Sequence, residues 1–289
     1  MNPTNKTPSV VFLIPFAPRS VKTQWDTACA QLRQTLASIR NSTSGKFAVV
    51  VAGHEAPTFP VATDDRFHFR SLNHPLPEHP SRGVAVRLDK LAKISAAWEY
   101  AKANWKPKYV MKLDADDFVS SQLVGWLDSA GTAPGYLIKQ GWIWRSEARW
   151  LIQRTETLDR ICGSCLLIRS DLADQTGPFL TEVEGVVLGE ANSNFAASDH
   201  YSLVPGSGIS TLLSNDSHQR YAAQFAYLGH ELPSLPFPAV VYRTSNVNSI
   251  TRITAEARPK FKARMWLGKI RRLRLITPKL KSEFGLNAS

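Results

Sequence analysis

The sequence lacks long apolar runs and has few cysteines. Its longest uninterrupted apolar stretches, such as Val10–Ile14 and Phe47–Ala52, are strand-sized, and none approaches the roughly 18 residues that a membrane-spanning helix needs. The first eight residues are polar, so we expect no secretory leader. The three cysteines, Cys29, Cys162 and Cys165, are an odd count. This count indicates free thiols in a reducing compartment, and we therefore expect a cytoplasmic protein.

Repeats of fixed period and low-complexity stretches are also missing from the 289 residues. Hydrophobic residues make up 43% of the chain and charged residues 20%, which are ordinary values for a globular protein. These values exclude a wholly disordered chain, a collagen-like repeat and a disulfide-stapled miniprotein. The length allows one large domain or two small ones.

The net charge of +11 lies almost entirely in the last segment. Residues 252–289 contain eleven Lys or Arg residues and two acids, which leaves residues 1–251 nearly neutral. An apolar stripe that includes Trp266 predicts a basic amphipathic helix over residues 259–276, ended by Pro278. Such a helix could hold residues 252–281 on an anionic membrane surface, at the inner membrane face, or pack on the domain with its cations in water. The rest of the chain has no basic face or RNA-binding motif, which argues against nucleic acid.

Strand and helix patterns alternate over the first 130 residues. This order predicts an α/β fold with an open, mostly parallel, twisted sheet and helices on both faces. The expected buried strands are Ser9–Phe16, Phe47–Ala52 and Tyr109–Leu113, with Arg66–Leu72 as a short further strand; the expected helices carry the apolar residues of 25–39, 91–105 and 123–127.

Three carboxylates, Asp114, Asp116 and Asp117, follow the predicted strand Tyr109–Leu113. Ligands of open α/β sheets bind beyond the carboxyl ends of the strands. Three acids within four residues repel one another, and a divalent cation would offset this repulsion. Hard oxygen ligands suit Mg²⁺ or Mn²⁺, which are commonly held by one or two carboxylates together with substrate phosphates. The alternative is an Asp-rich turn that caps a helix beginning at Ser120.

The run Leu113-Asp114-Ala115-Asp116-Asp117 resembles the Asp-x-Asp motif of glycosyltransferases with the GT-A fold, family 2-like members in particular. The segment Asp89–Lys93 is similar to the donor-side segment that precedes this motif in those enzymes. Ser198-Asp199-His200 lies where many inverting members carry a catalytic acid pair, although here His follows Asp where a Glu-Asp pair is common. The resemblance covers roughly residues 8–250.

The resemblance implies a metal-dependent enzyme that moves a sugar from a nucleotide-diphosphate donor to a saccharide or lipid-linked acceptor. It implies a catalytic domain over 1–251, with a nucleotide-binding half about 8–131 and an acceptor half about 132–251, followed by the basic tail 252–289. By this resemblance Asp116 binds Mn²⁺ or Mg²⁺, Asp114 faces the ribose or the metal, Asp117 lies nearby and Asp199 is the base; the alternative for Asp199 is a helix N-cap. His200 or His230 completes the metal site, as in some GT-A enzymes, or is a surface or core histidine. Pro15, His54, Lys90 and Lys93 are expected to line the donor site, with solvated lysines on a helix face as the alternative for the last two.

Trp142 and Trp144 alternate along a predicted strand, which places both on one face. They predict an aromatic platform for an acceptor sugar, or equally a core-packing hairpin. Two other functions stay open for the chain. A nucleotidyltransferase on a similar sheet should carry a glycine-rich loop, which Phe16-Ala17-Pro18-Arg19 is not. A non-enzymatic adaptor would bind a membrane surface or nucleic acid through the basic tail.

Overall fold

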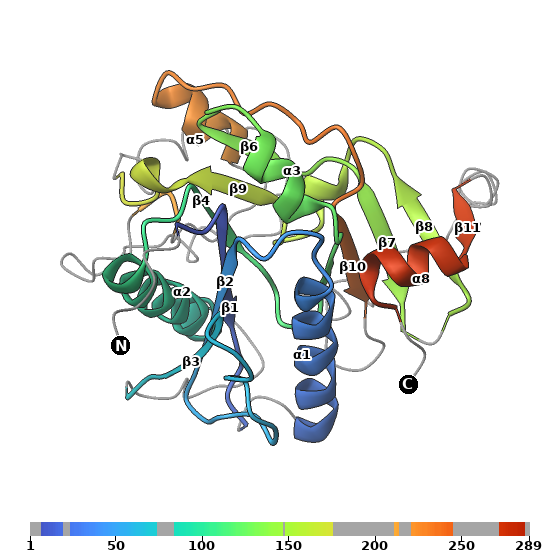
Figure 1. The fold of residues 1–289 in the computed structure, drawn as a ribbon, viewed down its shortest axis with the longest axis horizontal. Helices are drawn as coiled ribbons and strands as arrows, with labels where there is room; N and C mark the ends of the chain where they lie inside the picture. The colour runs from blue at the N-terminus through green and yellow to red at the C-terminus, as the bar shows by residue number, and fades with distance from the viewer. Residues whose placement is uncertain are drawn as a thin grey trace.

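The computed structural model describes residues 7–19, 24–73, 84–146, 148–175, 211–213, 221–244 and 272–286, with the backbone alone for 84–88. These residues form two sheets, with helices around them (Figure 1). The strands of the first sheet are β1 (Val10–Pro15), β2 (Phe47–Gly53), β3 (Phe67–Ser71), β4 (Tyr109–Lys112), β6 (Gly135–Leu137) and β9 (Leu166–Arg169).

The first sheet has the strand order β3-β2-β1-β4-β9-β6. Strands β3, β2, β1 and β4 are parallel, and β9 runs antiparallel to both β4 and β6. Parallel strands covered on both faces carry continuous apolar runs, and every residue of β2 is buried. The four strands expected from the sequence are all present, within two residues of their expected bounds.

Helix α1 (Trp25–Arg40) connects β1 to β2, and α2 (Val84–Asn104) connects β3 to β4. Because β2 and β4 lie on opposite sides of β1 and such crossovers are right-handed, the two helices must cover opposite faces of the sheet. Figure 1 shows α1 and α2 on either side of β1 and β2. The expected α/β fold, with helices on both faces of a mostly parallel sheet, is therefore confirmed.

The second sheet has the order β11-β8-β7-β10-β5. Its strands are β5 (Phe118–Val119), β7 (Gly141–Arg145), β8 (Trp150–Arg154), β10 (Val240–Thr244) and β11 (Leu273–Leu275). The remaining elements are the helices α3 (Leu123–Ser129), α5 (Tyr221–Tyr227) and α8 (Pro278–Phe284), and the short 3-10 turns Leu158–Arg160 and Ser170–Leu172. The sheets do not divide at residue 131: β5, which precedes it, belongs to the second sheet, whereas β6 and β9, which follow it, complete the first.

The described end of the basic tail differs from the expected helix. Residues 273–275 form β11, antiparallel to β8, and Pro278 begins α8 rather than ending a helix. Proline suits the first turn of a helix, where its missing N–H would have had no partner, and the Thr277 side chain caps the same turn by accepting from Leu280 N. Phe284 and Leu286 are buried against the second sheet. Residues 252–271 lie outside the described residues, and no helix within the described ranges is long and apolar enough to cross a membrane.

Candidate functional site

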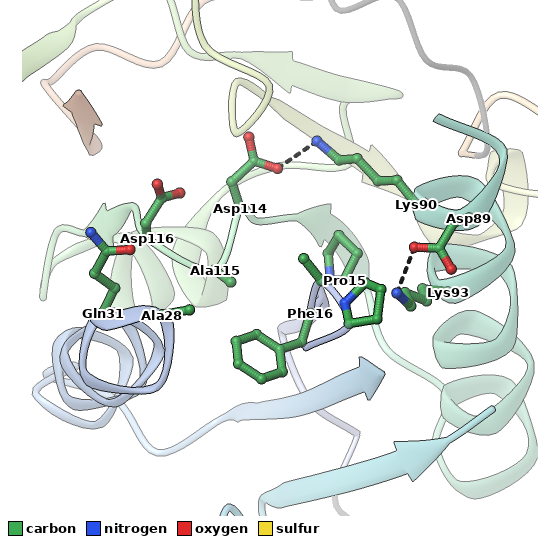
Figure 2. A pocket seen from close by; sticks show the side chains of 12 residues that line it. Pro15, Phe16, Ala28, Gln31, Asp89, Lys90, Lys93, Asp114, Ala115 and Asp116 are labelled. Atoms are coloured by element: carbon green, nitrogen blue, oxygen red, sulfur yellow. Dashed lines mark hydrogen bonds and ion pairs between the residues drawn. The ribbon is translucent and has the colours of Figure 1, made fainter. Parts of the chain in front are cut away.

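A cavity of about 180 Å³ lies beyond the carboxyl ends of β1 and β4. The chain leaves β1 toward α1 and enters β4 from α2, so this is the point where the order of the sheet reverses, the usual ligand position in such sheets. Drug-sized ligands occupy about 300–1,000 Å³, so the cavity accommodates only part of a nucleotide sugar. The lining residues are Pro15, Phe16, Ala17, Pro18, Ala28, Gln31, Asp89, Lys90, Lys93, Asp114, Ala115 and Asp116 (Figure 2).

Asp114 and Asp116 both line the cavity, as the sequence predicts. The Lys90 ammonium reaches from α2 to the Asp114 carboxylate, with 2.6 Å between Nζ and Oδ1. Figure 2 shows this pair pointing toward each other, while Asp116 lies beside Gln31 of α1. The repulsion expected among the three neighbouring acids is thus offset in part by a protein cation, Lys90.

Asp117 faces the interior, which corrects its predicted place among the metal ligands. Its side chain is fully buried. One carboxylate oxygen accepts from the Ser164 hydroxyl at 2.6 Å and the other from the backbone N–H of Arg243 at 3.0 Å. Burial, and then the charges of Asp116 and Asp114, raise the pKa of Asp117 well above its usual value. Asp117 therefore ties the acidic loop to β10 and does not line the cavity.

Ser164 is a site residue that the sequence does not reveal. Its hydroxyl accepts from the backbone N–H of Asp114 at 2.9 Å while it donates to Asp117. A Cβ on Gly163 would lie 3.0 Å from Asp114 Oδ2, so the segment before β9 packs closely on the acidic loop. Nearly 50 residues separate these partners in the chain, and a single sequence carries no pattern that would pair them. The neighbouring cysteines are buried free thiols, as expected.

A buried chain of charged groups forms the α2 side of the cavity. His54 Nε2 lies 2.8 Å from Asp89 Oδ1, and Lys93 Nζ lies 2.6 Å from Asp89 Oδ2. The Lys93 side chain is 1% exposed, and burial lowers the pKa of its ammonium. Lys90 and Lys93 thus line the cavity as expected, whereas His54 lies behind Asp89 and orients it.

Arg243 of β10 places a second protein cation behind the acidic loop. It is 4% exposed, and one guanidinium nitrogen donates to Gln34 Oε1 at 2.6 Å. Burial lowers the pKa of Arg243 to about 10, while the charges of Asp116 and Asp117 act in the opposite direction. The acidic loop therefore lies between Lys90 on one side and Arg243 on the other.

The packing of Trp142 and Trp144 favours the core-packing hairpin over the acceptor platform. Trp142 is buried in a small core with Phe118 and Leu151. Trp144 packs edge-to-face on Phe118, with 5.6 Å between ring centroids, and its indole N–H donates to Ala148 O. The predicted shared face is present, but α8 packs against it and places Phe284 in the same core. Neither tryptophan lines the cavity.

Asp199 and His200, the predicted base and metal ligand, lie outside the described residues. His230 follows α5 and is not among the residues that line the cavity. Among the described residues, no group of three or more His, Cys, Asp or Glu side chains is placed to hold a metal ion. Three carboxylates line the cavity, of which Asp89 is paired with His54 and Lys93, so the donor set offered to a metal is Asp114 and Asp116. Two carboxylates fit Mg²⁺ or Mn²⁺, which complete their coordination with water and substrate phosphates.

The raised pKa of Asp117 predicts a pH-dependent stability difference between the wild type and Asp117→Asn. A carboxyl group whose pKa is higher in the folded than in the unfolded protein contributes its full stabilisation of the fold at pH values below its unfolded-state pKa, which is 3.8 here. That contribution is lost as the pH rises through the folded-state pKa. In urea unfolding with chelator present, the wild type should lose stability relative to Asp117→Asn as the pH rises above about 4. A difference that stays constant with pH would contradict this.

Comparisons with known proteins give distant structural similarity only. No protein-family model matches the sequence, and no curated protein matches it.

TarS from S. aureus is similar at 12% identity and a TM-score of 0.43, over 86% of this chain and 39% of that one. A candidate nucleotide-diphospho-sugar transferase from Desulfovibrio desulfuricans G20 is similar at 10% identity and 0.36, over 92% and 98%. The glycosyltransferase GlyE of Streptococcus pneumoniae TIGR4 is similar at 9% identity and 0.37, over 84% and 56%. Since these TM-scores lie below 0.5, the activity has to be inferred from the cavity itself.

Proposed function

We propose that this chain is a metal-dependent glycosyltransferase of the GT-A type, which moves a sugar from a nucleotide-diphosphate donor to a saccharide or lipid-linked acceptor. The observation that carries the proposal is the cavity at the reversal point of the parallel sheet. It joins two carboxylates, Asp114 and Asp116, with two lysines, Lys90 and Lys93. Carboxylates that can hold Mg²⁺ or Mn²⁺, beside lysines that can contact phosphates, form the charge pattern that a metal-bound diphosphate requires.

The reaction that fits this arrangement builds negative charge on the departing diphosphate. A bound divalent ion would supply positive charge at the phosphate oxygens. Lys90 contributes the protein's part, because its ammonium lies at the cavity wall and can leave Asp114 Oδ1 for a phosphate oxygen when Asp114 binds the metal. Lys93 is held in place by its ion pair with Asp89 and adds fixed positive charge. Such preorganised charges stabilise a transition state without reorganisation during the reaction.

The acceptor side is proposed from the sequence resemblance alone. Direct displacement needs a base within hydrogen-bond reach of the acceptor hydroxyl, and we propose Asp199 for this role, with inversion at the sugar. Wild-type turnover in Asp199→Asn would remove that assignment. The resemblance also suggests His200 as a further metal ligand. A nucleotidyltransferase has less support, since the loop Phe16–Arg19 along the cavity contains no glycine to cradle phosphates.

A thermal-shift panel tests the proposal. The full chain is heated with UDP-, GDP-, dTDP- and CMP-sugars, each with and without Mn²⁺. At least one diphosphate donor should raise the melting temperature only when Mn²⁺ is present, and at a hundredfold excess over Kd the stabilisation should be about 2.7 kcal/mol. The CMP-sugar, with its single phosphate, is the internal control and should give a smaller shift. If no nucleotide sugar gives a metal-dependent shift, the proposal fails.

A further inference from the structure

The outer edge of the second sheet exposes apolar side chains next to one another. Trp150 of β8 is 47% exposed and Leu275 of β11 is 72% exposed. The two residues are direct cross-strand partners, so their side chains lie on the same face of the sheet. Ile152 and Leu273 are also cross-strand partners, two residues further along each strand on the same face, and both are half-buried. We call these four residues and Arg154 the ribbon face.

The opposite face of the same strands is the one that packs inside the protein. Leu151, which alternates with Trp150 and Ile152 along β8, is fully buried with Phe284 of α8. Figure 1 shows α8 lying against β7 and β8, with β11 at the edge of the sheet. The ribbon face therefore points away from the core that holds β8 and β11 in place, and its apolar residues are not members of either core cluster.

Positive charge surrounds the exposed apolar pair. Residues 149–154 and 272–281 contain six Lys or Arg residues and no acid. Arg154 shares the face of Trp150; the residue is half-buried, and its Nε atom is buried with no hydrogen-bond partner among the described residues. Burial, and then the charge of Arg272, lower the pKa of Arg154. Two segments that carry several cations and no acid favour an anionic partner.

We propose that the ribbon face docks on an anionic membrane surface, where Trp150 and Leu275 enter the boundary between headgroups and acyl chains while Arg154 contacts lipid phosphates. Arg272 is exposed just before β11 and, by strand alternation, on the other face; it adds positive charge at the edge of the contact. Trp at the interface and cations beside it are the usual anchors of peripheral membrane proteins. A lipid surface fits better than nucleic acid, because acyl chains remove Leu275 and its half-buried neighbours from water, whereas a nucleic acid offers aliphatic side chains no apolar phase. This docking does not depend on the proposed transferase activity.

Vesicle sedimentation with the full chain tests the proposal. The wild type should bind phosphatidylcholine vesicles containing phosphatidylglycerol, bind phosphatidylcholine alone more weakly, and release as salt is raised. The double variant Trp150→Gln/Leu275→Gln should bind the anionic vesicles at least about tenfold more weakly. Tyr227→Gln is the matched control, because Tyr227 is 59% exposed on α5, and it should bind like the wild type. Arg154→Gln/Arg272→Gln should lose the preference for phosphatidylglycerol.

Three outcomes would overturn the proposal. The first is a wild type that does not sediment with the anionic vesicles, and the second is a Trp150→Gln/Leu275→Gln variant that binds them as tightly as the wild type. In the third, a single-stranded oligonucleotide displaces the wild type from the vesicles, and it binds the wild type but not the Arg154→Gln/Arg272→Gln variant. This result would make the ribbon face a nucleic-acid surface. Donor-induced thermal shifts should be the same in all variants, so a failure of docking is distinguishable from a failure of the transferase proposal.

Discussion

Replacing Asp116 by asparagine should abolish the metal-dependent thermal shift by nucleotide sugars and lower turnover about 10²–10³-fold. Asp116 lines the cavity at the end of β4, and the amide keeps its size while removing the charge that would hold the ion. The fold should persist, because Asp117 and Ser164 tie the acidic loop to the rest of the protein.

Asp65→Asn is the matched control for this experiment. It makes the same chemical change at an exposed position next to β3, and it should leave both donor binding and turnover unchanged. Asp114→Asn should also lower the metal-dependent shift, and it releases Lys90 from its 2.6 Å contact. If Asp116→Asn kept the full shift while Asp65→Asn behaved as expected, Asp116 would have no part in metal or donor binding.

Replacing Lys93 by methionine should destabilise the protein by about 3–5 kcal/mol. The Lys93 and Asp89 side chains are 1% and 7% exposed, so the substitution leaves a buried carboxylate without the cation 2.6 Å away. The hydrogen bond from His54 remains but does not replace the lost charge. The measurement is the free energy of unfolding in urea. The two proteins are compared where the dependence of this free energy on urea concentration is the same for both.

Lys90→Met supplies the comparison, because Lys90 pairs with Asp114 in the same cavity but is 40% exposed. Exposed pairs contribute about 0–1 kcal/mol, so this variant should be nearly as stable as the wild type. The double variant Asp89→Asn/Lys93→Met should recover part of the loss, because neither buried charge is then left alone. Equal unfolding free energies for Lys93→Met and Lys90→Met would show that the buried pair contributes no more than the exposed one.

The first sheet could be predicted because its strands are continuous apolar runs bounded by clear breaks. Phe47–Ala52 is expected as a buried strand, and β2 spans Phe47–Gly53. The placement of Asp114 and Asp116 beside the cavity follows from the same argument, since both come directly after a central parallel strand. Local pattern and fold agree here, which is why a single sequence is enough.

The rest depends on partners that are distant in the chain. The inward turn of Asp117 is set by Ser164 and by the backbone of Arg243, and no local feature of Asp114–Asp117 distinguishes it from its neighbours. The burial of Trp142 depends on α8, which begins more than 130 residues later. The apolar spacing of residues 273–275 predicts helix, but these residues form β11, because pairing with β8 overrides the local pattern.

Mn²⁺ binding, followed by electron paramagnetic resonance with and without UDP, tests the central claim most directly. The claim is that the cavity carboxylates hold a divalent ion together with a nucleotide diphosphate. The free Mn²⁺ signal should fall when wild-type protein and UDP are both present, and it should fall far less with Asp116→Asn. An equal loss of free Mn²⁺ with both proteins, or none with the wild type for any nucleotide diphosphate, would contradict the account.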